Sequence, residues 1–422
     1  MRRLRRLHEI LGRPKEIIAG LLILAVVASA TGIFASPRHP RAREAASEAG
    51  GGGAFVPATV PPTTTTSTAP PTTTTTPPPP PTTQPAPPTT APPATTRSAA
   101  PSPPPPAPPA HGPTPSAALG VYTGAANPAG AASFAAATGA HVSVVEDYLP
   151  GSGSWSGIDG AGGSLDWMFG AWKGSGYQLV LGVPMFAGSD SPPDTLAAGA
   201  AGAYNSYFVT LAQTLVSAGQ GDAILRLGQE FTGNWNAWRV TDTTDAANYA
   251  AYFRQIVTAM RTVPGQAFRF IWEGADPQDG SYSGVYTADD AYPGDAYVNY
   301  IGSDTYDQSW SGGCGLSFNN TTTAAQSQCS WANTLLPGLT RVADYAAAHG
   351  KPVVFPEWGL AIRGDGHGMG DDPAYVQEMA AWISSHNVAF DIYFNFDVSG
   401  QVDAITDGHF PASLATFRSA FG

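Results

Sequence analysis

The chain has 422 residues and an acidic composition, with 20 Lys and Arg against 32 Asp and Glu and a formal net charge of -12. The basic residues concentrate near the N-terminus, so nucleic-acid binding is not expected. The histidines are scattered, and no His or Cys pair stands at metal-ligand spacing. We therefore expect neither a metal site nor a cofactor.

The N-terminal part predicts export. Residues 1–16 carry many Arg and Lys side chains and are expected to stay in the cytoplasm, because they precede the uncharged, mostly apolar residues 17–35. That run is close to the roughly 20 residues that a membrane-spanning helix needs. We expect a transmembrane helix that anchors an extracytoplasmic chain. The alternative is a secretory signal sequence that is cleaved near Ala28-Ser29-Ala30, which would release a secreted protein.

Residues 36–116 are predicted to be a disordered linker rich in Pro and Thr. From about 56 to 115 the sequence is almost entirely Pro, Thr, Ala and Ser. Such a composition does not bury apolar surface and favours an extended chain of about 3.1 Å per residue. The segment is therefore expected to act as a spacer.

Residues 117–422 are predicted to form one α/β domain, a (β/α)8 or TIM barrel. Short apolar segments alternate with Ala-rich, helix-like segments, as is typical of this fold. The expected strands are 119–122, 141–145, 178–183, 224–227, 268–272, 297–302, 352–355 and 389–394. The expected helices are 131–138, 165–173, 200–218, 245–261, 331–349, 373–386 and 412–421.

Two of the predicted strands lead directly to a glutamate. Gln229 and Glu230 follow strand 224–227, and Glu357 follows strand 352–355. Active sites of (β/α)8 barrels lie at the C-terminal ends of the strands, and glycoside hydrolysis requires two carboxyl groups on either side of the scissile bond. The sequence therefore predicts Glu230 and Glu357 as a catalytic pair, with Glu273 after the fifth strand as a rival.

Three segments carry a resemblance to a known family. Arg226-Leu-Gly-Gln229-Glu230-Phe-Thr-Gly233-Asn-Trp235-Asn-Ala-Trp238 resembles the fourth-strand motif of glycoside hydrolase family 26, a β-mannanase-like group in the clan of retaining (β/α)8 glycosidases. Tyr300-Ile-Gly-Ser-Asp304-Thr-Tyr306 and Phe355-Pro-Glu357-Trp-Gly359 resemble the sixth-strand and seventh-strand segments of that clan.

The resemblance implies a role for each of four residues. Glu230 is expected to be the acid/base and Glu357 the nucleophile, with Tyr306 hydrogen-bonded to Glu357 and Arg226 beneath it keeping the carboxylate ionised. A retaining mechanism implies carboxyl groups roughly 5–5.5 Å apart. Two positions depart from the family: Gln229 stands where His is usual, and the eighth strand lacks a terminal Trp, for which Phe394 or Phe396 could substitute.

Further residues are predicted to surround this pair. Trp235 is expected to form an apolar wall that keeps Glu230 protonated. Tyr122 and Glu146 are candidates for further sugar subsites. Aromatic side chains at strand ends and in loops are candidates to stack on sugar rings: Trp235, Trp238, Trp272, Trp310 and Trp358. Export makes a disulfide between Cys314 and Cys329 plausible, in a loop that either walls the cleft or is a braced surface loop.

The sequence thus predicts a membrane-anchored retaining glycoside hydrolase that acts on a β-linked polysaccharide, such as a β-mannan or a related β-glycan. A monomer is expected. Two alternatives remain open. One is a non-catalytic carbohydrate-binding or wall-associated protein on the same barrel, and the other is a transglycosylase that remodels envelope glycans.

Overall fold

The computed structural model describes residues 117–422 apart from residues 152, 189–193, 276–287 and 311–312. The predicted cytoplasmic segment 1–16, the apolar segment 17–35 and the linker 36–116 lie outside the described residues. Among the helices of the described part, none is both long enough and apolar enough to cross a membrane.

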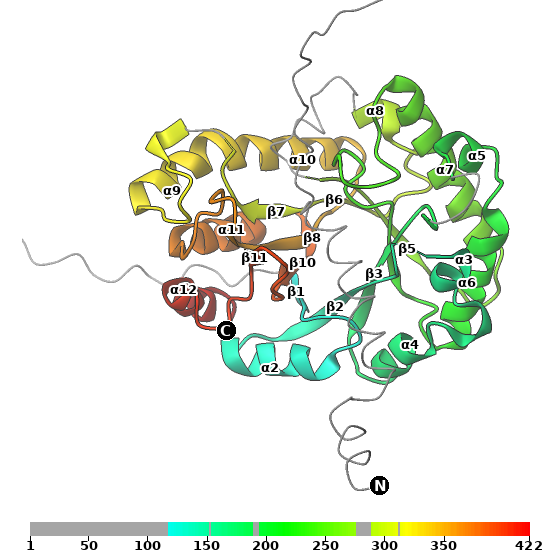
Figure 1. Ribbon diagram of the computed structural model, residues 1–422, viewed down its shortest axis with the longest axis horizontal. Helices are drawn as coiled ribbons and strands as arrows, with labels where there is room; N and C mark the ends of the chain where they lie inside the picture. Colours follow the sequence, from blue (N-terminus) through cyan, green and yellow to red (C-terminus); the bar gives the residue numbers. More distant parts are fainter. Residues whose placement is uncertain (1–116, 152, 189–193, 276–287, 311–312) are drawn as a thin grey trace, which may run out of the picture. The chain divides into compact units, whose positions relative to one another are not determined.

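Eight parallel strands close into a barrel, which confirms the predicted fold class (Figure 1). The strands are β1 (Ala118–Tyr122), β2 (Val142–Tyr148), β3 (Gln178–Val183), β4 (Ile224–Leu227), β5 (Arg269–Gly274), β6 (Tyr300–Ser303), β8 (Val353–Leu360) and β10 (Val388–Phe394). The barrel closes because β10 pairs with both β1 and β8.

Three short strands add to this frame. β7 (Thr305–Asp307) follows β6 and pairs with β8, so the seventh strand of the barrel carries the label β8. β9 (Ile362–Arg363) and β11 (Gln401–Val402) follow β8 and β10 and pair with each other in an antiparallel sheet.

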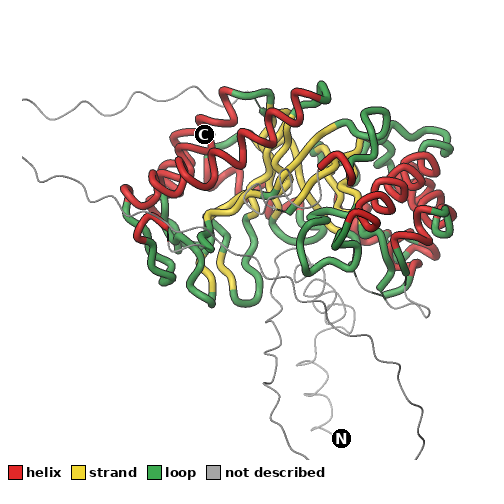
Figure 2. The backbone as a smooth tube through the Cα atoms, turned by 90° about the horizontal axis from the view of Figure 1, so that it is seen from above, coloured by secondary structure: helices red, strands yellow, loops and turns green. Residues whose placement is uncertain are grey.

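Helices form a ring around the strands in Figure 1, and Figure 2 shows them on both sides of the strands. They are α2 (Pro128–Thr138), α3 (Trp155–Asp159), α4 (Asp166–Trp172), α5 (Leu196–Ala200), α6 (Asn205–Ser217), α7 (Thr243–Met260), α8 (Ala288–Ala291), α9 (Ala324–Ser330), α10 (Leu336–Ala348), α11 (Pro373–Ser385) and α12 (Pro411–Phe421). A π-helical turn, Trp331–Leu335, joins α9 to α10.

Several predicted elements have different limits in the structure, and local features explain three of the differences. The helix predicted over 200–218 is divided into α5 and α6, because Gly202 adopts a φ of +84°, which an α-helix does not allow. The helix predicted to start at 331 starts at 324, where Thr323 and Gln326 form a capping box. The strand predicted to end at 145 continues to Tyr148, because Glu146, Asp147 and Tyr148 also pair with β3.

The alternation of side chains along each strand separates the interior of the barrel from the helix layer. Ile224 belongs to a small apolar cluster, whereas Leu225 and Leu227 belong to the large cluster that includes the buried helix residues. Because successive side chains of a strand point to opposite faces, Arg226 lies on the same face as Ile224. The small cluster comprises Val144, Val180, Ile224, Ile271, Val354, Phe390 and Ile392. This cluster fills the interior of the barrel below Arg226 and its polar partners.

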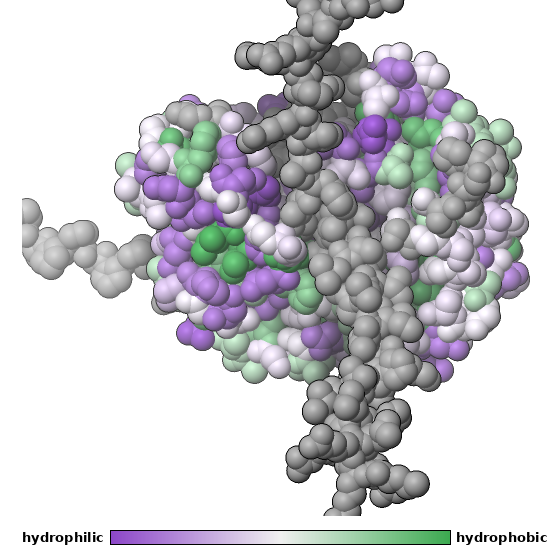
Figure 3. All heavy atoms as spheres, in the orientation of Figure 1, coloured by the Kyte–Doolittle hydropathy of each residue, from purple (hydrophilic) through white to green (hydrophobic). Residues whose placement is uncertain are grey.

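Few large apolar side chains remain exposed. In Figure 3, the apolar areas that grey atoms leave visible are small and separated by polar residues. In the described ranges the exposed large hydrophobic side chains are Trp167, Trp310, Phe318 and Leu336.

Candidate active site

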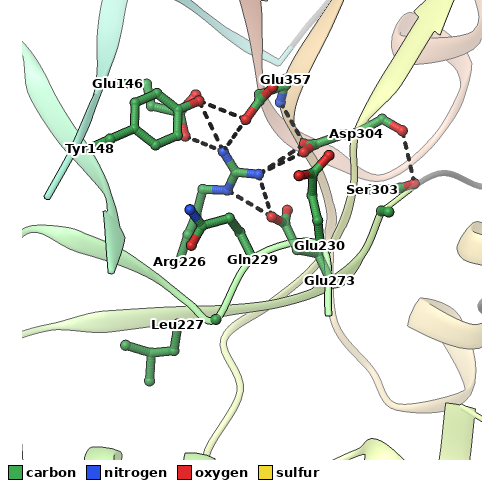
Figure 4. A network of polar contacts seen from close by, with 12 residues as sticks. Glu146, Tyr148, Arg226, Leu227, Gln229, Glu230, Glu273, Ser303, Asp304 and Glu357 are labelled. Atoms are coloured by element: carbon green, nitrogen blue, oxygen red, sulfur yellow. Dashed lines mark hydrogen bonds and ion pairs between the residues drawn. The ribbon is translucent and has the colours of Figure 1, made fainter. Parts of the chain in front are cut away.

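Arg226 is the centre of a buried polar network at the C-terminal ends of the strands (Figure 4). Its Nη1 lies 2.6 Å from Glu146 Oε1 and 2.9 Å from Glu357 Oε1. Its Nη2 lies 2.8 Å from Asp304 Oδ2, and its Nε donates to Glu273 Oε1 at 2.8 Å. One guanidinium therefore joins carboxylates from β2, β5, β8 and the junction between β6 and β7.

Glu357 is held by hydrogen bonds on both carboxylate oxygens. Tyr148 Oη donates to Oε1 at 2.7 Å, and Tyr306 Oη donates to Oε2 at 2.8 Å. The backbone N–H of Glu357 donates to Asp304 Oδ1 at 3.1 Å. Together with Arg226, these contacts fix the position of both carboxylate oxygens of Glu357. The structure thus brings together Glu357, Tyr306 and Arg226 as the resemblance implies.

Glu230 is buried directly after β4 and has an unusual backbone conformation. Its φ of +51° lies in the left-handed region, which is rare for a residue with a side chain and often marks a functional position. Burial raises the pKa of Glu230 well above its usual range, and the Glu357 carboxylate raises it further. A carboxyl group that keeps its proton at neutral pH is suited to protonate a leaving group.

Trp235 does not act as the purely apolar wall that the sequence predicts. Its Nε1 donates a hydrogen bond to Glu230 Oε2 at 2.7 Å. This bond lowers the pKa of Glu230, whereas burial, which is the larger effect, raises it. The indole therefore orients the carboxyl group. Trp235 is partly exposed, so one part of its ring remains available to a ligand.

The loop after β4 is fixed by side chains that bind its backbone. Trp238 Nε1 donates to the Gln229 carbonyl at 2.8 Å, and Asn236 Nδ2 donates to the same oxygen at 3.1 Å. Trp238 is thus a support for the loop and not a sugar-stacking residue. The Oε1 atom of Gln229 is buried and has no hydrogen-bond partner among the residues that the structure describes.

Trp272 and Trp358 are core residues, which corrects their prediction as sugar-stacking residues. Each is fully buried and belongs to the large cluster. Trp272 Nε1 donates to the Ala291 carbonyl at 3.1 Å, and Trp358 Nε1 donates to Asp391 Oδ1 at 2.9 Å. Each indole follows or precedes an interior glutamate by one position, so the alternation of the strand turns it to the opposite face.

Three residues at the site were either not predicted from the sequence or were predicted to have a different role. Tyr148 was not predicted at all, although it stands two residues after Glu146 and four after Val144, on the interior face. Glu146 is completely buried against Arg226 and does not line a subsite. Tyr122 is 1% exposed and packs edge-on against Tyr148, so it supports the aromatic wall instead of contacting solvent.

The network contains more carboxyl groups than one cation neutralises. Burial raises the pKa of Glu146 to about 8 and that of Glu273 to about 7, although the charge of Arg226 opposes both shifts. Burial also raises the pKa of Asp304. Some of these groups therefore hold protons at neutral pH. Because Glu273 is bound to Arg226, the rival catalytic candidate instead supports the guanidinium.

Two further sequence predictions concern the surroundings of the site. Phe394 is completely buried, whereas Phe396 is partly exposed and packs edge-on against Tyr122, so only Phe396 presents surface to a ligand. Cys314 and Cys329 are joined in a disulfide. The bond joins Cys314, in the segment after β7, to Cys329 on α9.

The sequence similarity centres on the part of the chain that contains this site. Residues 203–335 match the model of glycosyl hydrolase family 26, a range that includes Arg226, Glu230 and Tyr306 and ends before Glu357. A mannan endo-1,4-β-mannosidase from Bifidobacterium adolescentis is 28% identical over 202 residues, which are 44% of this chain and 18% of that protein. The chain thus spans less than a fifth of the length of this relative.

A solved structure shows the same fold. A double mutant of an endo-β-1,4-mannanase from Cellulomonas fimi superposes with a TM-score of 0.51 and 19% identity over 72% of this chain and 70% of that chain. A modular endo-β-1,4-mannanase from the same organism has a TM-score of 0.49 and 18% identity over 72% and 73% of the two chains. The resemblance to family 26 is confirmed by the family match, and the first structure supports the barrel.

Proposed function

We propose that this chain, which resembles glycoside hydrolase family 26, is a retaining glycoside hydrolase of the β-mannanase type. The observation that carries the proposal is the unequal environment of two buried carboxyl groups at one end of the barrel. Glu357 receives hydrogen bonds from two tyrosines and an arginine. Glu230 has a raised pKa and a side chain oriented by Trp235.

The two environments match the two roles in a double displacement. In the first step the Glu357 carboxylate attacks the anomeric carbon, while Glu230 gives its proton to the glycosidic oxygen as that bond breaks. In the second step Glu230, now ionised, takes a proton from water. The resulting hydroxide equivalent attacks the anomeric carbon and releases Glu357 as a carboxylate.

The rest of the network positions the nucleophile. Tyr148 and Tyr306 donate hydrogen bonds to the two oxygens of Glu357, and the Arg226 guanidinium forms an ion pair with one of them. As the glycosyl ester forms, Glu357 loses its negative charge, and Arg226 keeps its bonds to Glu146, Glu273 and Asp304. The guanidinium is thus held in place through both steps.

A β-linked mannan is the proposed substrate, because a named relative and a named structural neighbour act on mannans. The test is the release of reducing ends from β-mannan, xylan and mixed-linkage β-glucan by the full chain. Glu230→Gln and Glu357→Gln are compared with Glu378→Gln, which changes a partly exposed glutamate on α11 outside the site. We expect the first two variants to lose activity and the control to keep it.

Three outcomes separate the proposal from its alternatives. If the wild-type chain binds a glycan without cleaving it, the protein is a carbohydrate-binding protein. If it transfers the glycosyl group to a sugar acceptor in preference to water, it is a transglycosylase. Nuclear magnetic resonance of the first product gives the stereochemistry: a β-anomer supports retention, and an α-anomer excludes the double displacement.

We also propose that residues 17–35 export the domain and anchor it to the membrane. The disulfide between Cys314 and Cys329 supports an oxidising, extracytoplasmic location. Fractionation of cells that express the full chain should place it in the membrane fraction with residues 1–16 still present. A soluble product whose N-terminus lies close to Ala30 would instead indicate a cleaved signal sequence.

A further inference from the structure

Two exposed aromatic side chains flank one histidine on the surface of the domain. Trp310 is 58% exposed and Phe318 is 46% exposed. The ring centroid of His367 lies 4.4 Å from that of Trp310 and 4.2 Å from that of Phe318. The Arg363 guanidinium lies 5.0 Å from the Trp310 ring. We call these four residues the Trp310 platform.

Hydrogen bonds tie together the chain segments that carry the platform. His367 Nδ1 lies 2.7 Å from the Ser309 carbonyl, and the Ser309 N–H donates to the His367 carbonyl at 2.9 Å. Asn320 bonds both the carbonyl and the N–H of Arg363 at 2.8 Å. The disulfide closes the segment that contains Phe318. A surface ordered in this way loses little conformational entropy when it binds a ligand.

The platform is connected to the candidate active site through two short stretches of chain. Trp310 follows Tyr306 by four residues, which span at most about 14 Å. The Oη atom of Tyr306 lies 2.8 Å from Glu357. Arg363 follows Glu357 by six residues and lies on β9, the strand after β8. A glycan chain that is bound at Glu357 and extends beyond it by several sugar residues can therefore reach the platform.

The charge of the platform favours a neutral ligand. Arg363 donates from Nε and Nη2 to the two oxygens of Asp365, at 3.1 Å and 2.9 Å. The Arg363 hydrogen bond lowers the pKa of Asp365, so this residue is ionised at neutral pH and cancels the charge of the guanidinium. An acidic sugar would thus gain no net attraction, whereas aromatic faces pack against the apolar C–H faces of any sugar ring.

We propose that the Trp310 platform binds a neutral sugar residue of the same glycan chain, at a distance from the bond that is cleaved. This inference rests on the proposed glycoside hydrolase function. It assigns a role to exposed aromatic residues that the catalytic network does not use. The contact would be made equally before and during the reaction, so it would act on KM more than on kcat.

The test compares Trp310→Ala with Trp167→Ala in the full chain. Trp167 is 46% exposed on α4 and is the matched control. With polymeric β-mannan we expect kcat/KM of Trp310→Ala to fall about 3- to 10-fold, the size of one lost aromatic contact. With the shortest manno-oligosaccharide that the wild type cleaves, we expect no change. Trp310→Phe should recover most of the loss, because it keeps an aromatic face.

Other outcomes would contradict the proposed role of the platform. An unchanged kcat/KM on the polymer, or an equal fall on the short and long substrates, excludes a distant sugar contact. If the wild type cleaves no glycan, the proposed function fails, and the platform is tested by binding alone. Glu357→Gln and the double variant Glu357→Gln/Trp310→Ala are then compared by electrophoresis in a gel that contains β-mannan. Retardation of the first variant that is lost in the second would support the platform. Equal migration with and without Trp310 would exclude it.

Discussion

Replacing Glu146 by Gln is expected to weaken the pH dependence of the stability of the domain. Glu146 is completely buried, and its Oε1 lies 2.6 Å from Arg226 Nη1. Glutamine has nearly the same shape and keeps an oxygen that accepts from Arg226, but it has no proton to lose. The variant therefore removes the titration of one buried group and leaves the packing intact.

The size of the effect follows from the shift in pKa. The pKa of Glu146 rises from 4.5 to about 8 in the folded protein, chiefly through burial. The folded state therefore binds more protons than the unfolded state between these values, and stability falls as the pH rises through this range. At about 1.4 kcal/mol per pH unit, the shift corresponds to about 5 kcal/mol for an isolated group. Because Arg226 is shared with other carboxyl groups that titrate together, we expect about 2 kcal/mol.

The assay is urea unfolding at pH values from 5 to 9, with the free energy of unfolding extrapolated to water. The wild type should lose stability as the pH rises, and Glu146→Gln should lose about 2 kcal/mol less. Glu378→Gln, on the surface of α11, should follow the wild type. If Glu146→Gln and the wild type show the same pH dependence, Glu146 does not titrate in this range, and the reasoning about the network is wrong.

Three further predictions concern the site and its surroundings. Tyr306→Phe removes a hydrogen-bond donor to Glu357. In steady-state assays kcat should fall about 10- to 100-fold, as expected for the loss of a hydrogen bond to a charged group. An unchanged kcat would contradict this. Trp235→Phe removes the bond that lowers the pKa of Glu230, so the basic limb of the pH profile of kcat/KM should move to higher pH; movement to lower pH would exclude the assigned proton donor. Replacing both cysteines of the disulfide by serine should lower the free energy of unfolding by roughly 3 kcal/mol, because the bond closes a loop of 15 residues, and chemical denaturation measures this.

The fold was predictable because buried parallel strands form short apolar runs with a regular spacing. Such runs identify a strand with little dependence on distant contacts. The first and last residues of the helices were harder to predict, because they depend on single backbone features. Gly202 divides one predicted helix through its positive φ, and the capping box at Thr323 starts another helix before its apolar pattern begins.

The candidate site was predictable only as far as strand ends can be recognised. Glu230 follows β4 as predicted, whereas Glu357 lies within β8 and not after its strand. Trp272 stands beside Glu273 and Trp358 beside Glu357 in the sequence, which suggested a shared face that the structure does not have. Counting alternate positions from a known interior residue would have assigned the faces. The same count from Val144 identifies Glu146 and Tyr148 as interior residues. The tertiary contacts that make Arg226 a shared partner come from four separate strands or junctions, and no local pattern encodes them.

The burial of Trp358 has a consequence for how the domain can be recombined. The indole is one residue from Glu357 and stacks on Phe417 of α12, with ring centroids 5.9 Å apart. It also contacts Phe421 on the same helix. The last helix is therefore not an exchangeable module, even though it contributes nothing to the polar network. A chimera that takes α12 from another barrel inherits a different backing for the strand of the nucleophile, so α12 and β8 should be transplanted as one unit.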